Sequence, residues 1–139
     1  NQLLAGVHIA ATAEAMTLGA KIGIDLQQLH EVICECAGSS WMFENRGAHI
    51  VAGDYTPHSA VDIFVKDLGI VASEAGKAGC NTPLTSAALA LFQQASAAGL
   101  GREDDSAVAK ILAASAKVDL PGVDLPGVDL PEVTTADTR

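Results

Sequence analysis

The sequence predicts an all-α protein, a bundle of about six helices followed by an extended proline-rich tail. Apolar residues recur with helical spacing from the first residue to about Ala116. Glycines and helix-capping residues divide this stretch into segments of ordinary helix length. Hydrophobic residues form 49% of the chain but aromatic residues only 4%, which indicates closely packed helices with small side chains between them.

The first helix is expected from Asn1 to about Gly23. Its apolar residues cover nearly the whole circumference, which is typical of a helix buried on most sides, in a core or at an interface. Because the periodicity starts at the first residue with no capping residue ahead, we expect the chain to begin partway through a helix. Polar residues interrupt each apolar run, so no membrane span and no secretion signal is expected.

Two shorter helices are expected next. Asp25 can cap a second helix that runs to about Ala37. Its apolar stripe consists of Leu26, Leu29, Val32 and Ile33. Either Ser39 or Ser40 can cap a third helix, which Gly53 ends. The turn-like segment that follows is a candidate site loop.

Three more helices complete the bundle. The fourth is expected over 59–79. Thr82 and Pro83 form a strong start for the fifth, because the hydroxyl can cap the helix and proline at its first position loses no hydrogen bond. The last runs to about Ala116, and the acidic residues 103–105 suit the positive end of its dipole.

The C-terminal segment, residues 117–139, is expected to lie outside the core. The sequence Val-Asp-Leu-Pro-Gly occurs twice and is followed by Val-Asp-Leu-Pro-Glu. Proline recurs every five residues at Pro121, Pro126 and Pro131, so neither a helix nor a central strand can propagate. The segment is either a linker or a docking tail or hinge to another domain.

Charge and cysteine usage restrict the function classes. A net charge of −9 disfavours nucleic acid and anionic membranes as partners, because phosphate binding requires clustered Lys and Arg. Cys34, Cys36 and Cys80 show no metal-binding spacing, and neither do the histidines, so no metal site is expected. We interpret the cysteines as reduced, buried, small hydrophobic residues of a cytoplasmic protein.

Several segments, in this order, resemble the β-hydroxyacid dehydrogenase family, which includes 3-hydroxyisobutyrate dehydrogenase. They are residues 1–4, 13–15, 38–46, 53–57, 61–69, 83–85 and 105–107. The resemblance extends from Asn1 to about Ala114. Residues 6–10, 40–46 and 101–108 look most like members of the family that oxidise L-threonate, a four-carbon sugar acid, with NAD.

The resemblance implies a two-domain enzyme that oxidises a hydroxy acid to a keto acid. An N-terminal Rossmann domain with a glycine-rich phosphate loop would bind NAD, and no such loop occurs here. Residues 1–116 would then be the helical substrate-binding and oligomerisation domain, of the type found at the C-terminus of 6-phosphogluconate dehydrogenase. The implied partners are the hydroxy acid, the Rossmann domain, and further copies in a homodimer or homotetramer.

The family's acid/base lysine stands in a Lys-x-x-Asn-Gln motif, and Asn1 and Gln2 match its last two letters. The resemblance therefore places the lysine upstream of Asn1. One helical turn later, Gln2 would orient the lysine amine, with Asn1 beside it. The alternative is that both amides form an ordinary solvent-facing helix start.

The resemblance also gives Lys66 a role. In the family, the lysine of a Lys-Asp-Leu sequence contacts the cofactor across the domain cleft, and Asp67 would either orient that lysine or cap neighbouring backbone. The alternative is a surface ion pair or a side chain that reaches past apolar neighbours to solvent.

The substrate carboxylate is expected at a helix N-terminus, where Gly38, Ser39 and Ser40 offer hydroxyls and free backbone N–H groups. Trp41 and Phe64 would wall the pocket from water, although Trp41 could equally be a core anchor. His8, two turns along the first helix, could bind a substrate hydroxyl or be an ordinary core histidine.

Two further interpretations remain open from the sequence. Arg46 and Arg102 are expected in structural ion pairs, because Glu44, Glu103 and Asp104 are near in the chain.

The alternative to the enzyme is a non-catalytic helical interaction module whose first helix self-associates and whose tail links it to another protein.

Overall fold

The computed structural model describes residues 1–123 and is all-helical over them, as predicted. Its α-helices are α1 (Gln2–Lys21), α2 (Leu26–Cys34), α3 (Trp41–Ala52), α4 (Val61–Lys77), α5 (Pro83–Ala95) and α6 (Val108–Ala116). A wide helical turn, Ser96–Leu100, follows α5, and a short 3-10 helix, Asp105–Ala107, precedes α6.

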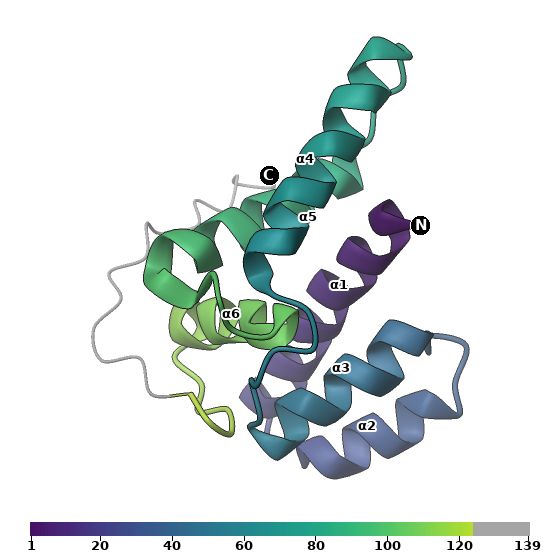
Figure 1. Ribbon diagram of the computed structural model, residues 1–139. Coiled ribbons are helices and arrows are strands. Elements are labelled where there is room, and N and C mark those ends of the chain that lie inside the picture. The colour runs from purple at the N-terminus through teal and green to yellow at the C-terminus, as the bar shows by residue number, and fades with distance from the viewer. Residues whose placement is uncertain (124–139) are drawn as a thin grey trace, which may run out of the picture.

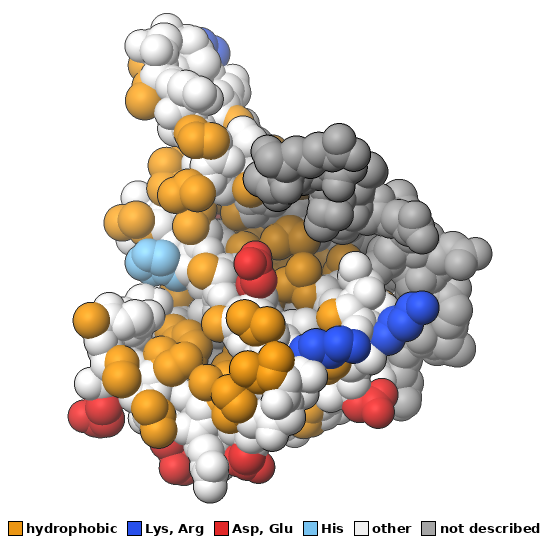
Figure 2. All heavy atoms as spheres, turned by 180° about the vertical axis from the view of Figure 1, so that it is seen from behind, with side chains coloured by type: hydrophobic (Ala, Val, Ile, Leu, Met, Phe, Trp, Pro, Cys, Tyr) orange, Lys and Arg blue, Asp and Glu red, His pale blue; other side chains and the backbone are white. Residues whose placement is uncertain are grey.

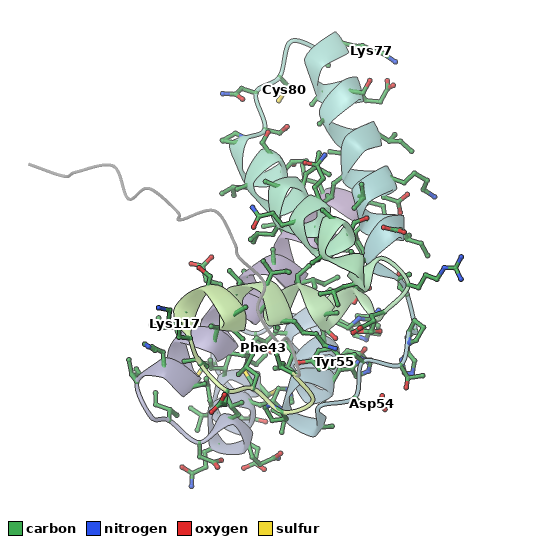
Figure 3. The ribbon with its side chains drawn as sticks, turned by 90° about the vertical axis from the view of Figure 1, so that its left-hand side faces the viewer. Phe43, Asp54, Tyr55, Lys77, Cys80 and Lys117 are labelled. Carbon is green, nitrogen blue, oxygen red and sulfur yellow. The ribbon has the colours of Figure 1, made fainter. Side chains whose placement is uncertain are left out.

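Helix α1 runs through the bundle and packs against all the other α-helices (Figure 1). Helices α2 and α3 lie side by side, whereas α4 and α5 form a hairpin that projects beyond the rest (Figure 1). Figure 3 shows Lys77 and Cys80 at the tip of this hairpin. The largest fully buried side chains include Ile9, Met16, Ile50, Leu68 and Phe92, so the core joins α1, α3, α4 and α5.

Helix α1 is less buried than its apolar circumference predicts. Leu4 and Leu18 are 58% and 60% exposed, although the opposite face is buried. By length and composition α1 could cross a membrane, so the expectation that polar residues interrupt it too early for this is wrong. Half of its most apolar stretch is buried in the bundle, as in the core helix of a soluble protein.

The helix caps explain most of the boundaries. The Asp25 side chain accepts a hydrogen bond from the backbone N–H of Gln28, and Ser40, rather than Ser39, caps α3 through the N–H of Phe43. Gly53 ends α3 in the left-handed conformation. Thr82, in contrast, makes no side-chain cap.

Three expectations about α2 and the cysteines are wrong. Helix α2 ends at Cys34, three residues before Ala37. Val32 is 62% exposed and lies outside the apolar stripe. Cys36 and Cys80 are exposed and only Cys34 is half-buried, so the cysteines are not core residues.

The acidic segment before α6 was expected only to interact with the helix dipole, but two of its carboxylates are buried in the bundle. Asp104 and Asp105 are both fully buried. Arg46 donates two hydrogen bonds to the Asp105 carboxylate, one of 3.1 Å from Nη2, and also pairs with Asp104. The predicted ion pair of Arg46 is thus confirmed and joins α3 to the start of α6. Arg102 is exposed and forms no ion pair within residues 1–123.

The first tail repeat packs onto the bundle, contrary to expectation. Leu120 is only 5% exposed and belongs to the core, with Val118 and Val123 packed against it. The helical unit therefore extends past Lys117. The remaining tail, 124–139, lies outside the described residues. The prediction that this tail is a linker therefore stays a prediction.

Candidate functional site

The start of α1 is joined to α4 by a line of polar side chains. Asn1 Nδ2 donates to Gln2 Oε1 at 2.7 Å, and Gln2 Nε2 donates to Asp67 Oδ2 at 2.7 Å. Lys66 Nζ lies 3.1 Å from the other oxygen, Asp67 Oδ1. These four residues, which we call the amide–lysine network, bring together three residues that the sequence singled out for catalysis and cofactor binding.

Close packing of α1 on α4 makes the network possible. A Cβ at Gly6 would lie 2.9 Å from both Leu68 methyl carbons, so only glycine lets the helices approach this closely without a shift. Leu68 follows Asp67 directly, and Gly6 lies one turn after Gln2. The same contact therefore holds the carboxylate of Asp67 within reach of the Gln2 amide.

The neighbours of Asp67 in the network lower the pKa of its carboxyl group. The Gln2 amide, and after it the Lys66 ammonium, lower the pKa of Asp67 below its ordinary value. Asp67 is therefore ionised at neutral pH and accepts from both neighbours. The Lys66 side chain is 66% exposed, so its ammonium can contact an anionic group from outside without leaving Asp67.

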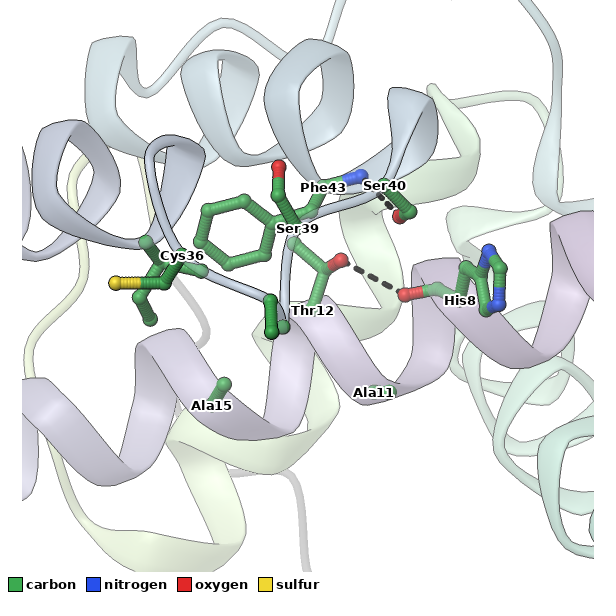
Figure 4. Close-up of a pocket in the computed structure, with 11 residues that line it drawn as sticks. His8, Ala11, Thr12, Ala15, Cys36, Ser39, Ser40 and Phe43 are labelled. Atoms are coloured by element: carbon green, nitrogen blue, oxygen red, sulfur yellow. Dashed lines mark hydrogen bonds between the residues drawn. The ribbon is translucent and has the colours of Figure 1, made fainter.

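A second feature is a pocket of about 470 Å³ between α1 and the segment that leads into α3, the α1–α3 pocket (Figure 4). His8, Gly38, Ser39 and Ser40 all line it. Four of the six residues predicted to bind substrate are thus brought together, although His8 precedes the other three by 30 residues or more in the chain.

The three hydroxyl groups that line this pocket are already engaged. Ser40 accepts from the Phe43 N–H as the cap of α3, and Ser39 Oγ donates to the Glu44 carboxylate at 3.1 Å. Thr12 Oγ1 donates to the backbone oxygen of His8, one of the bonds dashed in Figure 4. Because Glu44 places a negative charge in the first turn of α3, the geometry disfavours the predicted carboxylate site at this helix start.

Trp41 and Phe64 do not wall the pocket, so this part of the prediction is wrong. Phe64 is 3% exposed and stacks on Phe92 with ring centroids 5.1 Å apart, as a core residue. Trp41 is 65% exposed. It is therefore neither a pocket wall nor the core anchor that was the alternative.

The pocket and the network lie about two helical turns apart along α1. His8 follows Asn1 by seven residues, which at about 1.5 Å of rise per residue is roughly 10 Å. A four-carbon acid is shorter than this. One small substrate held at the network therefore reaches at most the near edge of the pocket, at His8.

Sequence reasoning missed the pairing of Gln2 with Asp67. The residues are 65 positions apart, and helical periodicity shows only which residues of one helix lie on the same face. It does not show which residues of two different helices meet. The structure also pairs His49 with the buried Asp104. Within residues 1–123, no three His, Cys, Asp or Glu side chains cluster as metal ligands.

Comparison with known families gives one match that covers most of the chain. Residues 1–112 match the family described as "NAD-binding of NADP-dependent 3-hydroxyisobutyrate dehydrogenase".

Individual relatives agree with this family. L-threonate dehydrogenase of Escherichia coli K12 is 60% identical over 122 residues, which are 88% of this chain and 39% of the relative. The crystal structure of 3-hydroxyisobutyrate dehydrogenase from Salmonella typhimurium is 63% identical, with a TM-score of 0.78 over 79% of this chain and 39% of that one. Mycobacterium tuberculosis 3-hydroxyisobutyrate dehydrogenase with L-serine is 28% identical, with a TM-score of 0.73 over 81% of this chain and 40% of that one. The chain thus spans about two fifths of the length of these relatives.

Proposed function

Because the chain belongs to the 3-hydroxyisobutyrate dehydrogenase family, we propose that it is the C-terminal helical part of an NAD-dependent hydroxy-acid dehydrogenase. The proposed reaction oxidises L-threonate to the corresponding keto acid. Identity of 60% to L-threonate dehydrogenase over 88% of the chain supports this substrate. The observation that carries the proposal is the amide–lysine network, which joins the proposed catalytic helix to the proposed cofactor lysine.

Gln2 is the residue through which the network acts on the reaction. Its Nε2 is committed to Asp67, so its carbonyl oxygen is the group that remains for other donors. That oxygen accepts from Asn1 and has a second lone pair. A lysine one turn upstream, as the family motif places it, would donate its ammonium to this oxygen and be held toward the substrate hydroxyl.

Lys66 is the residue proposed to meet the cofactor. Its exposed ammonium fits a pyrophosphate or ribose phosphate of a dinucleotide, and its pairing with Asp67 restricts where the side chain can swing. The bound nicotinamide would supply the hydride acceptor. Asp67 thus ties the orientation of Gln2 to that of Lys66.

We divide the remaining residues between substrate contact and support. His8, at the near edge of the α1–α3 pocket, is proposed to bind a distal substrate hydroxyl. Gly38, Ser39 and Ser40 are proposed to shape the pocket and position α3, since both hydroxyls are already engaged.

The direct test uses the full-length protein and its reading frame. The sequence upstream of Asn1 should encode a glycine-rich Rossmann loop and end in Lys-x-x before Asn-Gln. The purified protein should then reduce NAD with L-threonate, measured as NADH absorbance. Unrelated upstream sequence together with no NAD reduction by any four-carbon or three-carbon hydroxy acid would rule the proposal out.

The exposed apolar side chains favour a second candidate, a helical interaction module. Leu18, Trp41 and Leu84 are each at least 60% exposed. Figure 2 shows apolar side chains gathered over one face of the molecule. Such exposure is typical of an interface. A module without catalysis would self-associate in sedimentation experiments and lack an upstream Rossmann sequence, whereas a dehydrogenase that assembles through this face would have one.

A further inference from the structure

The first tail repeat occupies a defined seat at the end of α3. Lys117, labelled in Figure 3, has a φ of 52° and turns the chain back after α6. The Val118 N–H then donates to the Ala113 oxygen at 3.0 Å, and the Val123 N–H donates to the Leu120 oxygen at 3.2 Å. We call this seat, which holds residues 118–123 beside Gly53, the tail cradle.

The side chains of the repeat differ in how far the cradle buries them. It buries Leu120 and half-buries the valines on either side, Val118 and Val123. Asp119 and Pro121 are exposed. The cradle therefore selects apolar residues at the valine and leucine positions and leaves the aspartate to solvent.

The last position of the repeat must be glycine. Gly122 has a φ of 67°, and a Cβ there would lie 2.3 Å from the Gly53 carbonyl oxygen. Gly53 is equally restricted, since its own Cβ would lie 2.8 Å from the Gly122 nitrogen. Both contacts are with backbone, which cannot move aside as a flexible side chain can. Any side chain after Leu-Pro is therefore excluded, by conformation and by space.

The sequence carries two further copies of this pattern with one difference that matters. Residues 123–127 repeat Val-Asp-Leu-Pro-Gly without change. Residues 128–132 keep the valine and leucine but have Glu132 where the cradle needs glycine. We propose that the tail cradle is a docking site for Val-x-Leu-Pro-Gly, and that residues 123–127 replace 118–122 in it by a five-residue shift, whereas 128–132 cannot.

The shift needs no partner molecule because the second copy is tethered directly to the first. In the shifted arrangement residues 118–122 become an additional loop between Lys117 and Val123. Loop-closure entropy grows only slowly with length, so this loop costs little compared with the burial of a leucine. The first copy remains preferred because it closes the shorter loop.

A set of leucine variants of the 139-residue chain tests the proposal by thermal unfolding. Leu125→Ala alone should leave the Tm within about 2 °C of the wild type, because the first copy stays docked. In a Leu120→Ala background, the same substitution should lower the Tm by a further 5 °C, roughly, because the second copy then also lacks the leucine that the cradle buries. The matched control, Leu130→Ala in that background, should cause no further loss.

A gain-of-stability variant provides the second arm. Adding Glu132→Gly to the Leu120→Ala, Leu125→Ala double variant should make the third copy competent and restore most of the lost Tm. The recovery should not depend on protein concentration. Equal effects of Leu125→Ala in both backgrounds, failure of Glu132→Gly to restore the Tm, or recovery that requires high protein concentration would each overturn the proposed shift.

Discussion

Asp67 shows what a single residue adds to the sequence-based interpretation. Motif resemblance was sufficient to select Gln2 and Lys66, but it gave Asp67 only the role of orienting the lysine or capping neighbouring backbone. In the structure Asp67 contacts both of them, at 2.7 Å and 3.1 Å. This pairing depends on how α1 packs against α4, which no local pattern encodes.

Loss of the Gln2 amide should raise the pKa of Asp67. In Gln2→Leu the strongest cause of the lowered pKa is removed, and only Lys66 and partial burial remain. Carbon-13 NMR titration of the aspartate carboxyls in the isolated chain measures the shift. Gln27→Leu, which removes a surface pair with Glu31, is the control and should leave Asp67 unchanged.

The pH dependence of stability should follow from the same contact. Because the folded pKa of Asp67 is lowered, its stabilising effect is present above the ordinary value of 3.8 and is lost as the pH falls through the folded pKa. The difference in unfolding free energy between wild type and Gln2→Leu should therefore narrow below that pH. A difference that stays constant from neutral to strongly acidic pH would contradict the assignment.

Lys66→Ala in the full-length protein should raise the KM for NAD by about 10- to 100-fold, the loss expected for one charge-assisted contact. Lys77→Ala is the matched control, because both lysines lie on α4 and their side chains are 66% and 69% exposed. Steady-state kinetics with varied NAD measures the effect. If the two variants had the same KM, Lys66 would have no place in the cofactor site.

At the level of helices, caps and periodicity predicted most boundaries, whereas burial of polar and tail segments was not predictable. Asp25 and Ser40 cap their helices as local chemistry indicates. Asp104 and Asp105 resemble a solvated acidic run in sequence, yet Arg46 from a distant helix allows their complete burial. Leu120 is likewise buried in the core, although its proline-rich sequence context predicts a segment outside the core.

Removal of Arg46 should be strongly destabilising. Arg46→Leu leaves the buried Asp105 carboxylate without its arginine partner and should lower the unfolding free energy by about 3–5 kcal/mol, measured by urea denaturation. Arg102→Leu, at an exposed arginine, should stay within about 0.5 kcal/mol. Burial already raises the pKa of Asp105. The loss in Arg46→Leu should therefore shrink as the pH falls and Asp105 becomes protonated.

For the whole molecule, the all-helical class and the family resemblance of the sequence are confirmed over residues 1–112. The proposed catalytic network and the α1–α3 pocket lie about two turns apart along α1, as the sequence spacing of Asn1 and His8 predicts. Helix α1 also keeps an apolar face uncovered, with Leu4 and Leu18 exposed. That face is available to the remaining three fifths of such an enzyme or to another copy.

The isolated 139-residue chain should fold but bind NAD only weakly. Its network offers one lysine to the cofactor and no glycine-rich phosphate loop. Isothermal titration calorimetry measures the affinity, and circular dichroism shows that the chain is folded. Micromolar affinity for NAD by this chain alone would contradict the proposed division of labour between the domains.

The central claim is that the amide–lysine network serves hydride transfer from L-threonate. The most direct measurement is kcat/KM of the full-length protein for NAD reduction with L-threonate, compared between wild type and Gln2→Leu. We predict turnover by the wild type and a loss of about 100-fold or more in the variant, because the proposed upstream lysine would lose its partner. Absence of L-threonate oxidation, or equal kcat/KM in the two proteins, would contradict the account.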